Sequence, residues 1–355
     1  PSIYLHKLFN YITNNKKNLE IKVITTNYDI NNINKKKYSN LNKNYNKNYK
    51  VYYSKTLIKQ LSLNMLGKIF KDRRYYEIIY FNSFFSFYLI FLMIINFNRK
   101  QIFISPRGQL IYENLKKNNY FLKIIFLKII LFFGKKITLV FSGVNEKKNS
   151  INYFHNSKNI IIPNSSIYDL PKGNNVSFTS LKNKDRINVL TISRFSRRKN
   201  LDLIIKCAVN NQNKKYYFTI AGPDYGSRAE IQKLITKNKL TNVKLLNFVD
   251  EKIKNELFLK SDIFLLPSEG ENFGNIFLEA VYHYKPIIYL QNSPWSEINI
   301  NNKIGLAVSK NEKSINECLE RIVENYEKFK SEDFEKIQKQ FSYEVISDIF
   351  LDLIK

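Results

Sequence analysis

Two carboxylates, Glu271 and Glu279, lie in a segment whose pattern could hold a polyhydroxyl ligand. The segment begins with a short apolar run, residues 262–266, of the kind that forms a buried parallel strand. A polar turn ending at Gly274 follows, and apolar residues then recur with a helical period from Ile276. A strand, a glycine turn and a helix amino terminus in that order favour phosphate, because free N–H groups and the positive end of the helix dipole face the turn. The two carboxylates are acceptors that suit the vicinal hydroxyls of a ribose or a hexose.

A basic loop, SRFSRRKN at residues 193–200, lies between an apolar strand and an apolar helix. Arg194 stands at the strand end and Lys199 just before the helix, so both side chains can point at one anion while the helix dipole adds attraction. Arg197 and Arg198 add positive charge and are expected to be solvated. A basic surface loop is the alternative here, just as an ordinary turn with solvated acids is the alternative for the two carboxylates.

The elements around these loops predict an α/β architecture. Strand patterns cover residues 187–192, 217–220, 243–246, 263–266 and 287–290, and helical patterns lie between them. Alternating units with short turns imply a parallel sheet covered on both faces. Such sheets bind ligands at the carboxyl ends of their strands, so the acidic and basic loops are expected to converge.

The first half of the chain reads less regularly. Its expected strands are residues 21–26, 77–81, 101–104, 137–141 and 159–162, while residues 31–50, rich in Asn, Lys and Tyr, are expected to form a long solvated loop. A polar stretch, residues 165–184, is the expected linker. At the far end, residues 333–354 are expected to form one last helix.

Arg107 lies in the sequence SPRG, directly after the strand at residues 101–104. An arginine at the carboxyl end of a parallel strand can hold a phosphate or carboxylate through two hydrogen bonds. The alternative is a loop arginine that caps a helix.

The composition limits the possible partners. A chain of 355 residues favours two domains. The formal net charge of +27 comes mostly from lysine beside abundant Asn, Ile, Tyr and Phe, which A/T-rich codons would supply. Codon bias is therefore one explanation, and attraction to an anionic surface, either phospholipid or nucleic acid, is the other. Cys207 and Cys318 lie in apolar helical patterns and are expected to be small core residues.

Two apolar runs, residues 84–97 and 120–133, are too short to span a bilayer. The second lies within residues 114–136, where lysines are interspersed among aromatic and aliphatic residues. This pattern is typical of a helix that rests on a lipid surface, although a core helix with snorkelling lysines would look similar.

The motifs resemble the large family of retaining GT-B glycosyltransferases usually called family 4. The resemblance rests on PSEGENFG at residues 267–274 with the following Glu279, on Arg194 and Lys199 five residues apart, and on weaker landmarks. These landmarks are IAGP at 220–223, NFV at 247–249, SPWSE at 293–297 and the SPRG loop. The chain departs from the family at Gln109, where members often carry an acidic residue or Met, so a catalytic role there is not expected.

The resemblance implies two Rossmann-like domains with parallel sheets facing across a cleft. It places an acceptor domain at residues 1–168, a donor domain at 169–330, and a C-terminal helix at 331–355 that packs back on the first domain. Since the chain opens at a helix rather than a strand, the resemblance also predicts a fragment that lacks the family's first strand and glycine turn.

The implied activity is metal-independent, retaining transfer of a sugar from a UDP- or GDP-sugar to a glycan or lipid-linked acceptor in capsule or lipopolysaccharide synthesis. The implied roles follow the motifs. Catalytic positions are Glu271, Arg194 and Lys199; donor-binding positions are Glu279, Asn272, Phe273, Gly274, Asn275 and Val249; Arg107 lies on the acceptor side.

No cofactor or metal is expected, and His6, His155 and His283 lie outside every motif, so no histidine base is nominated. The expected location is cytoplasmic, at an anionic inner membrane face, without nucleic acid as a partner. The alternative is a basic nucleic-acid- or membrane-binding protein without catalysis, whose polynucleotide binding would fall steeply with salt.

Overall fold

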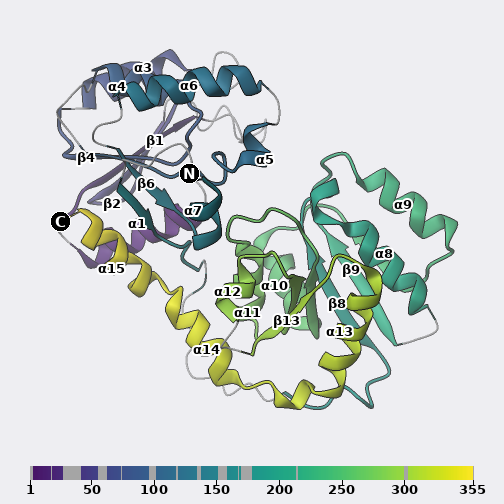
Figure 1. Ribbon diagram of the computed structural model, residues 1–355. Helices are drawn as coiled ribbons and strands as arrows, with labels where there is room; N and C mark the ends of the chain where they lie inside the picture. Colours follow the sequence, from purple (N-terminus) through teal and green to yellow (C-terminus); the bar gives the residue numbers. More distant parts are fainter. Residues whose placement is uncertain are drawn as a thin grey trace. The chain divides into compact units, whose positions relative to one another are not determined.

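The computed structural model describes residues 3–16, 18–26, 41–54, 62–72, 74–95, 101–116, 119–133, 137–150, 158–166, 168, 178–212, 215–299 and 303–354. The chain divides into two compact α/β units (Figure 1). Unit 1 comprises Pro1–Ile167 and Tyr343–Lys355, and unit 2 comprises Tyr168–Ser342.

Unit 2 contains a six-stranded sheet in the order β10-β9-β8-β11-β12-β13, and every pairing in it is parallel. Its strands are β8 (Ile187–Ile192), β9 (Tyr216–Ala221), β10 (Val243–Leu246), β11 (Ile263–Leu266), β12 (Ile287–Leu290) and β13 (Gly305–Val308). Its helices are α8 (Leu201–Asn210), α9 (Arg228–Lys237), α10 (Glu251–Lys260), α11 (Asn275–Tyr282), α12 (Trp295–Asn299), α13 (Glu312–Glu324) and α14 (Ser331–Gln340), with short 3-10 turns at Arg197–Lys199 and Tyr326–Lys328. Every residue of β11 and β12 is buried, which explains their unbroken apolar runs. The parallel sheet that the alternating pattern predicts is confirmed.

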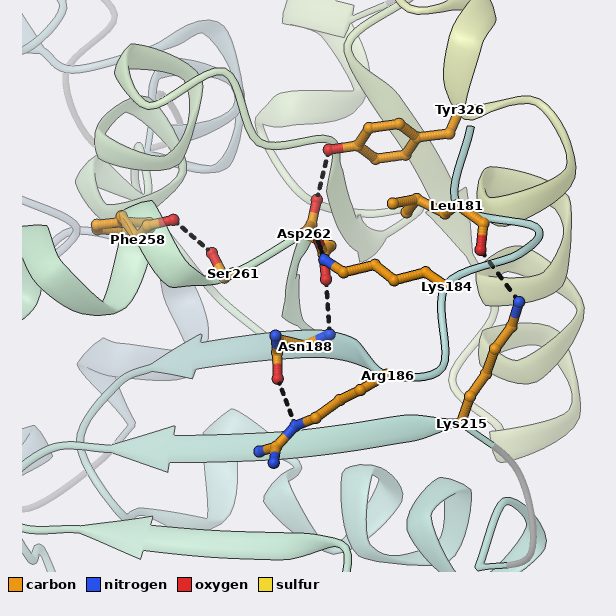
Figure 2. Close-up of polar contacts among 9 residues, drawn as sticks. All are labelled: Leu181, Lys184, Arg186, Asn188, Lys215, Phe258, Ser261, Asp262 and Tyr326. Atoms are coloured by element: carbon orange, nitrogen blue, oxygen red, sulfur yellow. Dashed lines mark hydrogen bonds and ion pairs between the residues drawn. The ribbon is translucent and has the colours of Figure 1, made fainter. Parts of the chain in front are cut away.

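Asp262 holds the amino end of β11 against β8 (Figure 2). Its Oδ2 accepts a hydrogen bond from the Asn188 backbone N–H at 2.8 Å, and its Oδ1 accepts one from Lys184 Nζ at 2.6 Å. The Tyr326 hydroxyl donates to the Asp262 carbonyl at 3.1 Å. Near the other end of the pair, Thr191 Oγ1 donates to the Leu265 carbonyl at 2.5 Å. The register between the two central strands is therefore specified along their whole length.

The last helical stretch is not one helix, which corrects the expectation for residues 333–354. It consists of α14 and α15 (Tyr343–Ile354), interrupted at Phe341 and Ser342. Phe341 is buried and packs edge-on against Phe273, with ring centroids 5.1 Å apart. Burial of this ring in the core of unit 2 coincides with the end of α14.

The described part of unit 1 contains two sheets. A three-stranded sheet has the order β1-β3-β2, and a four-stranded, fully parallel sheet has the order β4-β5-β6-β7. The strands are β1 (Ile21–Thr26), β2 (Leu41–Asn46), β3 (Tyr49–Ser54), β4 (Ile78–Phe81), β5 (Gln101–Ile104), β6 (Ile137–Phe141) and β7 (Lys158–Ile161). The helices are α1 (Ile3–Asn15), α3 (Leu63–Asp72), α4 (Phe87–Ile95), α5 (Tyr112–Leu115), α6 (Tyr120–Phe133), α7 (Val144–Ser150) and α15. Within this unit α15 packs on α1, where Phe350 meets Phe9 at a centroid distance of 5.7 Å.

The solvated loop expected at residues 31–50 is wrong over its second part, because β2 and the start of β3 form an antiparallel hairpin there. Tyr49 is completely buried and supplies the apolar surface that aliphatic residues usually provide. The Asn46 amide donates to Thr13 Oγ1 at 2.9 Å and to Asn14 Oδ1 at 2.8 Å, which docks the hairpin on α1. Residues 27–40 lie outside the described part of the chain.

Cys207 and Cys318 are free and buried in unit 2, which confirms them as core residues. Burial raises the pKa of each thiol to about 12, so neither thiol is a nucleophile at neutral pH.

Candidate functional site

Two loops meet at the carboxyl edge of the sheet in unit 2, because β8 and β11 are adjacent and parallel. One loop follows β8 and the other follows β11. Their backbones are joined where the Glu269 N–H donates to the Arg198 carbonyl at 2.8 Å. Asn200 donates from its amide to the Pro267 carbonyl at 2.8 Å. Asn200 adopts a left-handed backbone (φ 49°), which asparagine tolerates better than most residues. The two loops therefore form one connected structure.

Arg198, which was expected to be solvated, is half-buried and contributes to this connection through an exposed hydrogen bond. Its Nη2 donates to the Gly270 carbonyl at 2.9 Å. A Cβ on Gly270 would lie 1.8 Å from that nitrogen, and Gly270 has a φ of +65°. The left-handed backbone therefore favours glycine here, and a side chain at this position would displace the Arg198 guanidinium.

Lys199 and Glu271 form an ion pair across the two loops. Both side chains are largely buried, and Ser268 Oγ donates to the same Glu271 oxygen, Oε1, at 2.8 Å. None of the described residues hydrogen-bonds to Oε2. The pair therefore presents a fixed ammonium group and a carboxylate oxygen that can still accept a hydrogen bond from a ligand hydroxyl.

The amino terminus of α11 lies beside this pair in the chain. Gly274 precedes the helix with a φ of 75°, and a Cβ there would lie 2.8 Å from Phe277 Cδ2. Phe273 is buried, and Trp295 Nε1 donates to its carbonyl at 2.7 Å. Trp295 is itself completely buried, so the residue packs against the turn.

Arg194 is exposed at the end of β8, with its guanidinium 5.1 Å from the centroid of the Tyr225 ring. This cation–π contact orients Arg194 without neutralising its charge. Asn272, Asn275 and Val249 are half-buried, the first two beside Gly274 and the last after β10. Among the described residues, no group of three or more His, Cys, Asp or Glu could hold a metal ion.

Glu279 lies in a different environment from Glu271. It is buried in α11 and pairs with Lys254 of α10. The Tyr168 hydroxyl donates to Asn255 Oδ1 at 2.7 Å and more weakly to Glu279 Oε2 at 3.5 Å. Burial, followed by the nearby Glu279 carboxylate, raises the pKa of Tyr168, so the hydroxyl remains a donor.

His283 ends α11 beside this cluster and stacks on Phe258 with ring centroids 4.8 Å apart. Burial, followed by the charges of Lys285 and Lys254, lowers the pKa of His283 to about 4. The imidazole is therefore neutral at neutral pH. His155 lies outside the described residues.

Arg107 lies in unit 1. Its Nε donates to Asn82 Oδ1 at 2.6 Å, and its Nη1 donates to Asn164 Oδ1. The neighbouring Gln109 accepts from the Phe84 backbone N–H at 2.5 Å. Gln109 thus holds the start of the α4 region.

Sequence reasoning missed Lys254 and Tyr168 as partners of Glu279, and Asn82 as a partner of Arg107. The α10 sequence carries no signal for Lys254, because its contact depends on how α10 packs beside α11. Asn82 could have been found, since it directly follows a strand of the parallel sheet.

Residues 174–341 match the family model described as glycosyl transferases group 1. The matched range covers most of unit 2. The loops that carry Lys199 and Glu271 both lie inside the matched range, as does Glu279.

Two curated relatives align with parts of the chain. An uncharacterized 41.2 kDa protein in the cps region of Klebsiella pneumoniae is 27% identical over 126 residues, which are 36% of this chain and 34% of that protein. A probable sucrose-phosphate synthase of Thermosipho melanesiensis is 27% identical over 232 residues, 61% of this chain and 54% of that protein. The aligned parts thus span about a third and about half of these relatives.

Solved structures share the fold over the whole chain. HepE from Anabaena, in complex with UDP and glucose, has a TM-score of 0.72 and 14% identity, covering 100% of this chain and 96% of that one. Sucrose-phosphate synthase from Thermosynechococcus elongatus also has a TM-score of 0.72 and 14% identity, covering 99% and 92%. The fold is therefore that of GT-B glycosyltransferases, with two Rossmann-like units.

The pairing of Glu279 with Lys254 generates a stability prediction. Lys254→Met removes the cation from a buried carboxylate, which is expected to lower the free energy of unfolding by about 3–5 kcal/mol. The double variant Lys254→Met, Glu279→Gln leaves no buried charge and is expected to recover much of this loss. Chemical denaturation of the two variants and of Lys252→Met, an exposed lysine in the same helix, measures both effects. Equal free energies of unfolding in all three variants would show that the Lys254–Glu279 pair contributes nothing to stability.

Proposed function

We propose that the protein is a retaining, metal-independent glycosyltransferase that takes its sugar from a UDP- or GDP-sugar bound in unit 2. The observation that carries the proposal is the Lys199–Glu271 pair at the carboxyl edge of the sheet, beside the exposed Arg194 and the amino terminus of α11. The Lys199 ammonium, the Arg194 guanidinium and the backbone N–H groups after Gly274 bind the diphosphate, whose charge grows as the sugar leaves. Glu271 binds sugar hydroxyls through its available oxygen.

Glu279 is proposed to bind the ribose hydroxyls, and Lys254 holds its carboxylate in place. Asn272, Phe273 and Asn275 contribute backbone groups of the same turn, and Val249 lies where the base would rest. In the retaining step, a phosphate oxygen of the leaving diphosphate accepts the proton of the acceptor hydroxyl as that hydroxyl bonds to the anomeric carbon on the same face.

Support for a uridine nucleotide comes from HepE, which was solved with UDP and with UDP-glucose. The acceptor is proposed to be a glycan or a lipid-linked sugar of a cell-surface polysaccharide. The relative encoded in the cps region of Klebsiella pneumoniae is consistent with that role.

Substitution of the basic residues tests the donor site. Lys199→Ala is expected to weaken UDP binding by about 2–5 kcal/mol, because its charge is largely desolvated. Arg194→Ala, at an exposed position, is expected to cost about 1.4 kcal/mol, or roughly tenfold in affinity. Arg197→Ala in the same loop is the matched control and should bind UDP normally. Calorimetric titration with UDP and GDP measures these affinities and identifies the base.

Unchanged UDP affinity in both Lys199→Ala and Arg194→Ala would contradict the proposed donor site. Binding of polynucleotide that falls steeply with salt, without binding of any nucleoside diphosphate, would favour the non-catalytic alternative.

We also propose that unit 1 docks on an anionic membrane through α6. Leu127 and Ile130 of α6 are buried, whereas Phe121 and Phe132 are 75% and 79% exposed on another face of the same helix. The helix carries two lysines and no acid. The neighbouring α4 exposes Phe87 and Ile94, and α3, α4 and α6 lie along one side of unit 1 (Figure 1). Lys128 is exposed, whereas Lys123 is half-buried and donates to the carbonyls of Asn114 and Leu115. An apolar face beside an exposed lysine suits an anionic lipid surface. No helix among the described residues is long and apolar enough to cross a membrane.

Vesicle co-sedimentation tests this surface. The protein is expected to bind phosphatidylglycerol vesicles and to be released by salt, because salt screens the lysines. Phe121→Asp with Phe132→Asp should abolish binding, whereas Leu259→Asp, at a 70% exposed position of α10 in unit 2, should not. Equal binding of both variants, or equal binding to phosphatidylcholine vesicles, would rule out the proposal.

A further inference from the structure

Polar residues follow every strand of the four-stranded sheet in unit 1. Asn82 follows β4, Arg107 lies in the loop after β5, Ser142 follows β6, and Asn164 and Ser165 lie beyond the end of β7. Because the four strands are parallel neighbours, their carboxyl ends lie at one edge of the sheet. This edge is where open α/β sheets bind their ligands.

Arg107 is held at this edge in an unusual way. It adopts a left-handed backbone with a φ of 52°, a conformation that non-glycine residues keep only when their surroundings impose it. Its guanidinium donates to the side-chain oxygens of Asn82 and Asn164, which are both neutral. No carboxylate of the described residues forms an ion pair with Arg107. The side chain is therefore fixed in direction while its positive charge stays available for an anion.

A buried carboxylate accepts hydrogen bonds from the loops after β5 and β6. Glu146 of α7 is 1% exposed and accepts hydrogen bonds from the backbone N–H groups of Gly108 and Ser142 and from the Ser142 hydroxyl. All three donors belong to the loops themselves. Glu146 thus fixes the loops without forming an ion pair with Arg107.

Ser165 provides the second, independent sign of a ligand. Its side chain is 1% exposed, yet its hydroxyl has no hydrogen-bond partner among the described residues. Buried polar groups in native proteins nearly always have a partner, so an unpartnered hydroxyl calls for one. Ser165 and Arg107 line the same hollow, together with Asn164, Tyr4 and Tyr80. The cavity volume is about 10 Å³. This is room for one oxygen-sized group and not for a sugar ring.

We propose that the hollow binds one oxygen of a phosphate or carboxylate carried by the sugar acceptor, with Arg107 and the Ser165 hydroxyl as donors. The assignment of this anion to the sugar acceptor rests on the proposed glycosyltransferase function, whereas the anion site rests on unit 1 alone. A sugar phosphate and a uronic acid both present such an oxygen, and the experiment separates these two sources.

The test uses the full chain with saturating UDP, so that the proposed donor site is occupied. Glucose 1-phosphate, glucuronate, inorganic phosphate and uncharged glucose are titrated separately, and binding is followed by ligand-observed NMR. The anionic ligands are expected to bind and glucose is not. The tighter of glucose 1-phosphate and glucuronate identifies the phosphate or carboxylate source, and binding of inorganic phosphate alone would restrict the site to free phosphate and overturn the acceptor assignment.

Variants locate the binding. Arg107→Gln is expected to weaken the anionic ligand by about tenfold or more, because charge-assisted hydrogen bonds are lost. Arg107→Lys keeps the charge but loses the planar guanidinium with its paired donors. This variant and Ser165→Ala should each weaken binding of the anionic ligand by roughly threefold or more. Arg74→Gln, an exposed arginine of the same unit, is the matched control and should bind normally.

Thermal unfolding reports whether each variant is folded; should Arg107→Gln fail to fold, the other two variants carry the test. The proposal is overturned when the wild-type chain binds none of the anions, or when folded Arg107→Lys and Ser165→Ala bind as tightly as Arg74→Gln. Sugar transfer from a set of UDP- and GDP-sugars is assayed separately. Anion binding without transfer would contradict the proposed function and leave the anion site standing.

Discussion

The parallel pairing of β8 with β11 is the constraint on which the site in unit 2 depends. The two strands are far apart in the chain, and their adjacency brings the loop after each strand to one edge of the sheet. Asp262 and Thr191 specify the register, and the hydrogen bonds of Glu269, Arg198 and Asn200 then join the two loops. This framework brings Lys199 and Glu271 together, and the two side chains form an ion pair.

In both units a basic side chain lies at the carboxyl edge of a parallel sheet, but the partners of the two side chains differ in charge. In unit 2 the largely buried Lys199 is paired with a carboxylate, so an incoming diphosphate must compete with Glu271 for the ammonium group. In unit 1 Arg107 is oriented by two neutral amides, and the nearby Glu146 is occupied by loop donors. A ligand anion at Arg107 therefore meets no internal competitor among the described residues.

Much of this architecture could be predicted from the sequence because it depends on local patterns. Apolar runs identified five of the six strands of unit 2, all except β13, and the rule that ligands bind at their carboxyl ends brought Lys199 and Glu271 together. The hairpin of β2 and β3 was missed because few of its residues are aliphatic. The buried Tyr49 and the hydrogen bonds of Asn46 hold it in place instead. The pairing of Glu279 with Lys254 was missed because it depends on how two helices pack, which no spacing along either helix reveals.

A crystal structure of the protein with UDP bound tests the central claim most directly. The account predicts the diphosphate at the carboxyl edge of unit 2, with its oxygens within hydrogen-bonding distance of Lys199 and Arg194 and the ribose hydroxyls on Glu279. The Lys199 ammonium should then be shared between Glu271 and the phosphate. A diphosphate bound elsewhere, with the Lys199–Glu271 pair unchanged and no phosphate contact to either basic residue, would contradict it.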